Sequence, residues 1–197
     1  HAFLISMHLT LIDQYGQALG ELDTRIAEAV EPFQAARDLL TSIPGFSTTV
    51  AEVVLAETGG DMRVFPTAGH LASWAGTAPG SHESAGRVKS TKTRPGNRHL
   101  EGALGTAALS VSRSKGTFFS AKYKRIASRQ GPMKALVAVQ HAMLVAAWNM
   151  LTNGDLYRDP GPDYHTRRVP TKTRARAIGQ LESLGYRVIL EPAAGTA

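Results

Sequence analysis

Residues 133–151 read MKALVAVQHAMLVAAWNML, the most apolar stretch of the chain. Gly131-Pro132 precedes it and Asn153-Gly154 follows it, and residues of these types mark the two ends of a helix. A helix that is apolar on nearly every side is buried among other elements. Gln140 and His141 interrupt its apolar run, which is too short to cross a membrane. The stretch therefore predicts the central helix of a helical domain, and we expect no membrane partner.

The preceding sequence predicts a mainly α fold that begins with a long amphipathic helix. Apolar residues recur at intervals of three, four and seven along residues 9–33, which marks one face of a helix. This spacing is close to a heptad, so the helix either pairs with another helix as a coiled coil or packs alone against a core. Pro32 should kink or restart it. The apolar face consists of Leu9, Ile12, Leu19, Leu22, Ile26, Val30 and Phe33.

Shorter helices are expected between turns that are rich in Gly, Pro and Ser. Residues 76–96 are expected to form a Gly/Ser-rich loop with a short hairpin near residues 87–91. Residues 185–190 are expected to form a short strand. The predicted helices span residues 33–42, 48–57, 66–74, 97–112 and 117–129.

Three segments follow from this pattern. Residues 1–34 form a long, coiled-coil-like connecting helix, residues 35–153 the helical domain, and residues 154–197 a linker with a basic tail. The chain opens at His1 in the middle of a helical pattern, so we expect further sequence before it, with a processed or tagged chain as the alternative. Cysteine is absent, which excludes disulfides, thiolate metal sites and cysteine nucleophiles.

Positive charge is segregated in one part of the chain. Residues 80–134 hold twelve Lys and Arg against two acids, a net charge of +10, whereas the whole chain carries +6. Residues 1–79 carry three basic and nine acidic groups and are net negative. A segregated basic surface attracts polyanions by releasing their counterions, and nucleic acid is the commonest polyanion. Nucleic acid is therefore the expected partner.

Residues 39–47, LLTSIPGFS, resemble the turn of a helix-hairpin-helix element. In that element, backbone N–H groups at the start of the second helix point toward a phosphate. Gly45 permits the tight turn, Phe46 plugs it into the core, and Ser47 caps the helix that starts at Thr48. These four residues are candidate nucleic-acid contacts. Simple packing of two helices, without any nucleic-acid contact, is the alternative.

A serine lies among small residues in His82-Glu83-Ser84-Ala85-Gly86, just before a basic run. A serine hydrolase is disfavoured, because no Gly-x-Ser-x-Gly elbow is present and loop residues two apart seldom align for proton transfer. Cations near an accessible hydroxyl would instead hold a phosphodiester and stabilise the charge of its transition state. A basic loop that only binds backbone phosphates is the alternative. The candidate phosphate-binding residues are Arg87, Lys89, Lys92, Arg94, Asn97 and Arg98.

Four blocks of this sequence, within residues 35–150, resemble the C-terminal transposase domain of the insertion sequence 110 family in their order and spacing. They are IPG at 43–45, LASWAGTAP at 71–79 with Phe65 before it, ESAG at 83–86 and RPGNRHL at 94–100. These proteins are DEDD-type transposases of bacterial mobile elements, and several are guided by a bridge RNA. The family usually has glycine after its serine, where this chain has Ala85.

The resemblance implies a role in DNA transposition. In the family, a RuvC-like N-terminal domain supplies four acidic residues that bind magnesium, and the C-terminal domain supplies a catalytic serine that attacks DNA and joins to it. The two domains form a composite site across subunits. The family's serine falls on Ser84. Because no RuvC-like domain is present in this sequence, we expect no metal or cofactor in this chain, with Mg²⁺ bound by the other domain, and no activity of this chain alone.

The same resemblance implies DNA and a guide (bridge) RNA as partners in the bacterial cytoplasm. It also implies self-association through the long helix. The rival function is a non-enzymatic helix-hairpin-helix module that binds nucleic acid through residues 39–47 and the basic run. Covalent attachment of DNA to Ser84 distinguishes the two functions.

Overall fold

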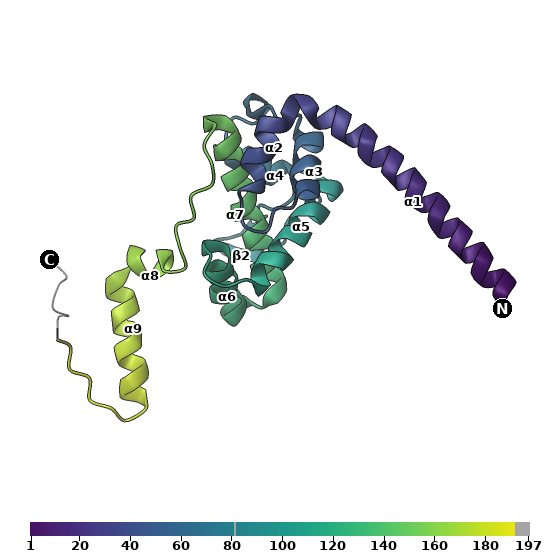
Figure 1. Ribbon diagram of the computed structural model, residues 1–197. Helices are drawn as coiled ribbons and strands as arrows, with labels where there is room; N and C mark the ends of the chain where they lie inside the picture. The colour runs from purple at the N-terminus through teal and green to yellow at the C-terminus, as the bar shows by residue number, and fades with distance from the viewer. Residues whose placement is uncertain (81, 192–197) are drawn as a thin grey trace.

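The computed structural model describes residues 1–80 and 82–191 and confirms a mainly α fold (Figure 1). The predicted central helix is α7, Pro132–Asn153, which starts after Gly131 and stops at Gly154 in the left-handed conformation. Contrary to the expectation from its interrupted apolar run, the helix is long and apolar enough to cross a membrane, with a mean hydropathy of 1.4 in an 18-residue window. One face of it is nevertheless buried in the core of the domain, which is how a central helix of a helical domain packs. The apolar residues buried there are Ala135, Val139, Met143, Leu144, Ala147 and Met150.

The most extensive contacts of α7 are with α4 (Ala68–Trp74), α5 (Arg98–Arg113) and α6 (Phe118–Gln130). Each begins with a side chain that accepts a hydrogen bond from a free backbone N–H: Thr67 for α4, Asn97 for α5 and Thr117 for α6. Such caps fix where a helix begins. α5 supplies the second large part of the core, with Leu100, Leu104, Ala107, Ala108 and Val111 buried.

The long N-terminal helix is α1, Ala2–Val30, and it projects away from the domain (Figure 1). None of its residues is buried. A short 3-10 helix, η1 (Glu31–Phe33), contains Pro32, and α2 (Gln34–Thr41) follows it. The restart predicted at Pro32 is confirmed, because proline cannot continue the hydrogen-bond ladder of the preceding helix.

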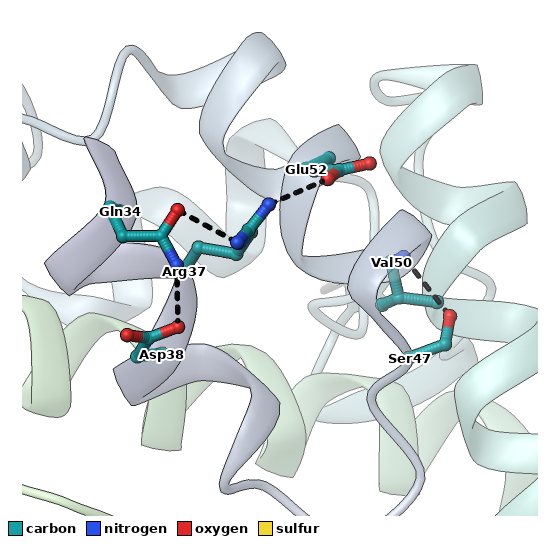
Figure 2. A network of polar contacts seen from close by, with 6 residues as sticks. All are labelled: Gln34, Arg37, Asp38, Ser47, Val50 and Glu52. Atoms are coloured by element: carbon teal, nitrogen blue, oxygen red, sulfur yellow. Dashed lines mark hydrogen bonds and ion pairs between the residues drawn. The ribbon is translucent and has the colours of Figure 1, made fainter. Parts of the chain in front are cut away.

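The helices α2 and α3 (Thr48–Thr58) contact each other and are joined by a tight turn. A polar network links their surfaces (Figure 2). Arg37 of α2 donates to Glu52 of α3 at 3.4 Å and to Gln34 at 2.7 Å, and Gln34 donates to Asp38 at 3.2 Å. A short 3-10 helix, η2 (Met62–Val64), leads from α3 towards α4.

The predicted hairpin is present, but it starts earlier than expected and contains the serine. Its strands are β1, His82–Ser84, and β2, Arg87–Ser90, and they pair antiparallel. After α7 the chain forms α8 (Tyr164–Arg168) and α9 (Pro170–Ser183). The strand predicted at residues 185–190 is wrong, since these residues have no regular structure. A single strand without a neighbour leaves its backbone groups unpaired and is not stable on its own.

Candidate nucleic-acid interface

Ser84 is the last residue of β1, and a two-residue turn joins it to Arg87, the first residue of β2. Both turn residues are left-handed, with φ of 52° at Ala85 and 72° at Gly86. A turn of this kind matches the twist of a two-stranded hairpin, but alanine adopts it at a cost because of its Cβ. Ser84 is exposed, as are both turn residues. The fold therefore presents the Ser84 hydroxyl at the tip of a hairpin.

The register of the hairpin places two predicted site residues together. Ser84 pairs with Arg87 across the strands, and Glu83 pairs with Val88. Cross-strand partners carry their side chains on the same face of a sheet, so the serine and the guanidinium share one face. A register shift follows, because His82 pairs with Ser90, which leaves Lys89 as an extra residue in β2. Such a bulge re-aims the side chains beside it.

An open concavity of about 640 Å³ lies beside the hairpin. We call its three cations, Lys89, Lys92 and Arg94, the basic rim. Ser84 lines the same concavity, so the hydroxyl and three of the predicted phosphate-binding residues meet at one place. Arg87, Asn97 and Arg98 are not among its lining residues. The full lining is Glu83, Ser84, Lys89, Ser90, Lys92, Thr93, Arg94 and Pro95.

Backbone contacts tie this hairpin to the domain. The Gly80 N–H donates to the Lys92 carbonyl at 3.1 Å, and Pro79 and Thr93 form an isolated bridge. The backbone at Gly76, just after α4, also lies against the backbone at Gly96, and the space between them leaves no room for side chains. A Cβ added at Gly76 would lie 2.8 Å from the Gly96 N and 2.9 Å from the Arg94 carbonyl oxygen. Close approach of this kind requires glycine.

Asn97 has a structural role that the sequence did not reveal. Its Oδ1 accepts from the His99 N–H at 3.1 Å and the Leu100 N–H at 2.9 Å, which caps α5. Its Nδ2 donates to the Glu57 carboxylate at the end of α3. Both ends of the side chain are thus used inside the protein. Arg98 follows in the first turn of α5 and is exposed.

The basic rim has no acidic partner in the described part of the chain. The ion pairs found there join Arg25 to Glu28, Arg37 to Glu52 and Arg63 to Asp61. None of the cations from Arg87 to Lys134 takes part in one. Charges of one sign that lack counterions attract a polyanion more strongly than neutralised ones do. Within residues 1–80 and 82–191, no group of three or more His, Asp or Glu could hold a metal ion.

The α2–α3 turn is explained by packing. Gly45 has φ of +91°, and a Cβ there would lie 2.8 Å from the Ala107 carbonyl oxygen of α5. Phe46 is buried, and its N–H donates to the Ile43 carbonyl at 3.0 Å. Ser47 caps α3 by accepting from the Val50 N–H at 3.3 Å.

Phosphate binding by Gly45, Phe46, Ser47 and Thr48 remains a prediction. Thr48 is exposed, and its N–H lies in the first turn of α3, where a helix leaves backbone donors without an intrahelical acceptor. The surrounding charge is less favourable than at the basic rim. Two carboxylates, Asp38 and Glu52, flank the single cation of the network drawn in Figure 2.

The chain is similar to a transposase family and to proteins of insertion elements. A family model described as "Transposase IS116/IS110/IS902 family" matches residues 37–124. A protein of Sinorhizobium fredii named "Putative transposase y4pF/y4sB" is 31% identical over 124 residues, 60% of this chain and 32% of that protein. The "Insertion element IS110 uncharacterized 43.6 kDa protein" of Streptomyces coelicolor is 31% identical over 125 residues, 63% and 31%. The "Insertion element IS900 uncharacterized 42 kDa protein" of Mycobacterium paratuberculosis is 30% identical over 142 residues, 71% and 35%. The chain thus spans about a third of the length of these curated relatives.

Proposed function

This chain carries a transposase domain of the IS110 family, and we propose that the domain presents Ser84 to a DNA strand as the nucleophile of strand cleavage and joining. One observation carries the proposal. The exposed Ser84 lies at the tip of a two-residue turn, on a concavity whose basic rim has no acidic partner among the described residues. A hydroxyl placed among cations meets a phosphodiester whose charge those cations stabilise.

The proposed step exchanges one ester bond for another. The Ser84 Oγ–P bond forms as the bond between phosphorus and one sugar oxygen breaks. The serine proton replaces phosphorus on that sugar oxygen, so one DNA end is a free hydroxyl and the other is a phosphoserine. Lys89, Lys92 and Arg94 stabilise the charge on the phosphoryl oxygens, and Arg87 shares the face of Ser84. Arg98, which is exposed in the first turn of α5, extends the contact with the strand, and Asn97 positions that turn as its cap.

We assign no metal to the concavity itself. Its lining contains a single carboxylate, Glu83, beside the three cations of the basic rim, and their positive charge disfavours a divalent cation there. The magnesium-binding acids that the resemblance implies would belong to another domain. The residues of this chain would then hold the strand and supply the nucleophile, without recombining DNA alone.

The remaining partners follow from the same proposal. DNA is the substrate, in the bacterial cytoplasm, and a bridge RNA is the guide. A second copy of the chain would pair along α1, where large apolar residues are exposed at intervals of seven. These are Ile5, Ile12, Leu19 and Ile26, the spacing of a coiled-coil seam.

The nucleophile is tested in the full-length transposase that contains this domain, with its guide RNA and labelled donor DNA. Wild-type protein should yield a covalent protein–DNA adduct that survives denaturation, and Ser84→Ala should yield none. Ser90→Ala is the matched control, because Ser90 lines the same concavity from β2 and should leave the adduct in place. An adduct that persists in Ser84→Ala, or that disappears only in Ser90→Ala, would refute the assignment.

The second candidate is a non-enzymatic module that binds nucleic acid through the α2–α3 turn and the basic run. The start of α3 favours this function. Ser47 caps only the Val50 N–H, and N–H groups that a helix N-terminus leaves without a partner bind anions. It predicts steeply salt-dependent binding without an adduct under any condition.

A further inference from the structure

The segment that follows α7 packs back onto the start of α6. Tyr157 stacks on Phe119, with ring centroids 5.4 Å apart and planes at 19°. The Tyr157 N–H donates to Ser42 Oγ at 3.0 Å. The Asp159 carboxylate accepts from the N–H of Phe118, the first residue of α6, at 3.0 Å, and an anion at a helix N-terminus is stabilising. The first part of the predicted linker is therefore held on the domain.

The aromatic packing continues into α8. Phe118 meets Tyr164 edge-to-face at 5.1 Å and lies 5.4 Å from the ring of His165. Lys122 Nζ lies 5.8 Å from the centroid of the Phe118 ring. Lys122 of α6 and His165 of α8 thus meet at one phenyl ring, and the charges of Arg125 and Arg168 act on His165. We call this group the α6–α8 surface: Lys122 and Arg125 from α6, His165 and Arg168 from α8.

Positive charge on this surface is not paired with negative charge. Burial lowers the pKa of Lys122, and the neighbouring Arg125 charge lowers it further. Burial also lowers the pKa of His165, and the charges of Arg125, Lys122 and Arg168 add to the effect. No ion pair of the described residues involves any of these four groups. The buried His165 Nε2 has no hydrogen-bond partner there either.

We propose that the α6–α8 surface binds the phosphodiester backbone of a nucleic acid, as a second contact apart from the basic rim. Lys122, Arg125 and Arg168 are like charges without an ion-pair partner among the described residues, and an incoming anion stabilises such a group. Arg125 and Arg168 are exposed, and guanidinium groups pair well with phosphate oxygens. The proposal rests on the proposed function only for the identity of the polyanion, and it does not depend on Ser84 as nucleophile.

The site is composite, because its cations come from segments far apart in the sequence. Arg168 and His165 are in place only while residues 157–165 stay packed on α6. Phe118 is the residue on which that packing centres, since it contacts Tyr164, His165 and Lys122. Loss of the Phe118 ring should therefore weaken binding without removing a charge.

The test measures the affinity of the full 197-residue chain for a short labelled duplex DNA, and for a single-stranded RNA of equal length, over a range of salt concentrations. Three double variants each remove two positive charges. Arg125→Gln/Arg168→Gln alters the α6–α8 surface, and Lys89→Gln/Lys92→Gln alters the basic rim. Arg25→Gln/Arg63→Gln is the control, because both arginines already pair with carboxylates.

The Arg125→Gln/Arg168→Gln variant should bind about tenfold more weakly at moderate salt, with the slope of log K against log salt reduced by about 2. The control should bind nearly as wild type does. An affinity and slope equal to those of the control would overturn the inference. If only the Lys89→Gln/Lys92→Gln variant weakens binding, the basic rim is a nucleic-acid contact and the α6–α8 surface is not. If only the Arg125→Gln/Arg168→Gln variant weakens binding, the α6–α8 surface is the contact and the basic rim is not. A larger loss of affinity for the DNA than for the RNA, or the reverse, identifies which nucleic acid the surface binds.

Phe118→Ala supplies an independent check of the composite site. It should weaken binding about as much as the double arginine variant while all charges remain, with helix content by circular dichroism unchanged. Full affinity in Phe118→Ala, together with full affinity in Arg125→Gln/Arg168→Gln, would exclude the α6–α8 surface as a nucleic-acid contact.

Discussion

Ser84 and Arg87 are cross-strand partners that close the β1–β2 hairpin, with only Ala85 and Gly86 between them. Their side chains share one face of the ribbon, so the hydroxyl and a guanidinium leave the tip together. The basic rim lies beside them on the concavity that Ser84 lines. Hairpin geometry, more than the density of charge in the sequence, thus determines which cations surround the serine.

Ala85 is the point of backbone strain in this hairpin, since it is the non-glycine residue with positive φ in the described part of the chain. Ala85→Gly should raise the free energy of unfolding by up to about 1 kcal/mol, because glycine adopts the left-handed conformation without a Cβ clash. Urea denaturation measures the change. Ala121→Gly, inside α6, is the control and should lower stability by about 1 kcal/mol. A lower free energy of unfolding in Ala85→Gly would show that the left-handed conformation of Ala85 is not strained.

Gly96 and Gly86 should respond differently to alanine. A Cβ at Gly96 would overlap the backbone of Ala75 and Gly76, so Gly96→Ala should cost more than about 3 kcal/mol or prevent folding. Gly86 has open space around it and φ of +72°, so Gly86→Ala should cost only about 1 kcal/mol through its backbone conformation. Thermal and urea unfolding of both variants compares the costs. If both variants lose the same free energy of unfolding, the backbone around Gly76 moves readily to admit a side chain at Gly96.

Asn97 combines a helix cap with a link to α3, and two substitutions separate these roles. Asn97→Ala removes both and should lower the free energy of unfolding by about 1–2 kcal/mol. Asn97→Ser keeps a capping oxygen but is too short to hold Glu57, so its loss should be smaller. If serine and alanine destabilise equally, the cap contributes little here.

His141 and His165 should make stability depend on pH. Burial lowers the pKa of both below the ordinary histidine value of 6.5, and the Lys122 charge lowers both further. The unfolded chain therefore takes up protons before the folded chain does, so stability is complete above about pH 6.5 and falls as the pH drops below it. Urea denaturation on both sides of that pH measures the fall. The His141→Gln/His165→Gln double variant should show a smaller fall than wild type, and an equal fall would assign it to other groups.

The exposed seam of α1 should drive self-association. Ile12→Glu/Leu19→Glu places charge in the seam and should leave the protein monomeric, because a coiled coil does not bury unpaired carboxylates. Sedimentation or light scattering gives the mass over a range of concentrations. Gln17→Glu/Thr24→Glu adds the same charge on the opposite side of the helix and should remain associated. A wild-type chain that is monomeric at every concentration would rule out pairing through α1.

The sequence predicted most helices within a few residues, because their caps, glycines and prolines act locally. α7 follows from its apolar run and its flanking Gly131 and Gly154, and the end of α1 follows from Pro32. The strand predicted at residues 185–190 failed because β-structure needs a partner that local pattern does not supply. The left-handed Ala85 was also missed, since Ala-Gly is a weak turn signal compared with Asn-Gly.

The sequence by itself determined the helices, the segregation of positive charge and the serine among small residues, because these depend on neighbours along the chain. Only the tertiary structure decided which charges meet. It placed Ser84 beside Lys89 and Arg94, turned Asn97 inward to Glu57, and brought His165 against α6. The first of these depends on the register of the hairpin, and the other two join residues that are distant in sequence. Both are set by packing and backbone register rather than by any one local pattern.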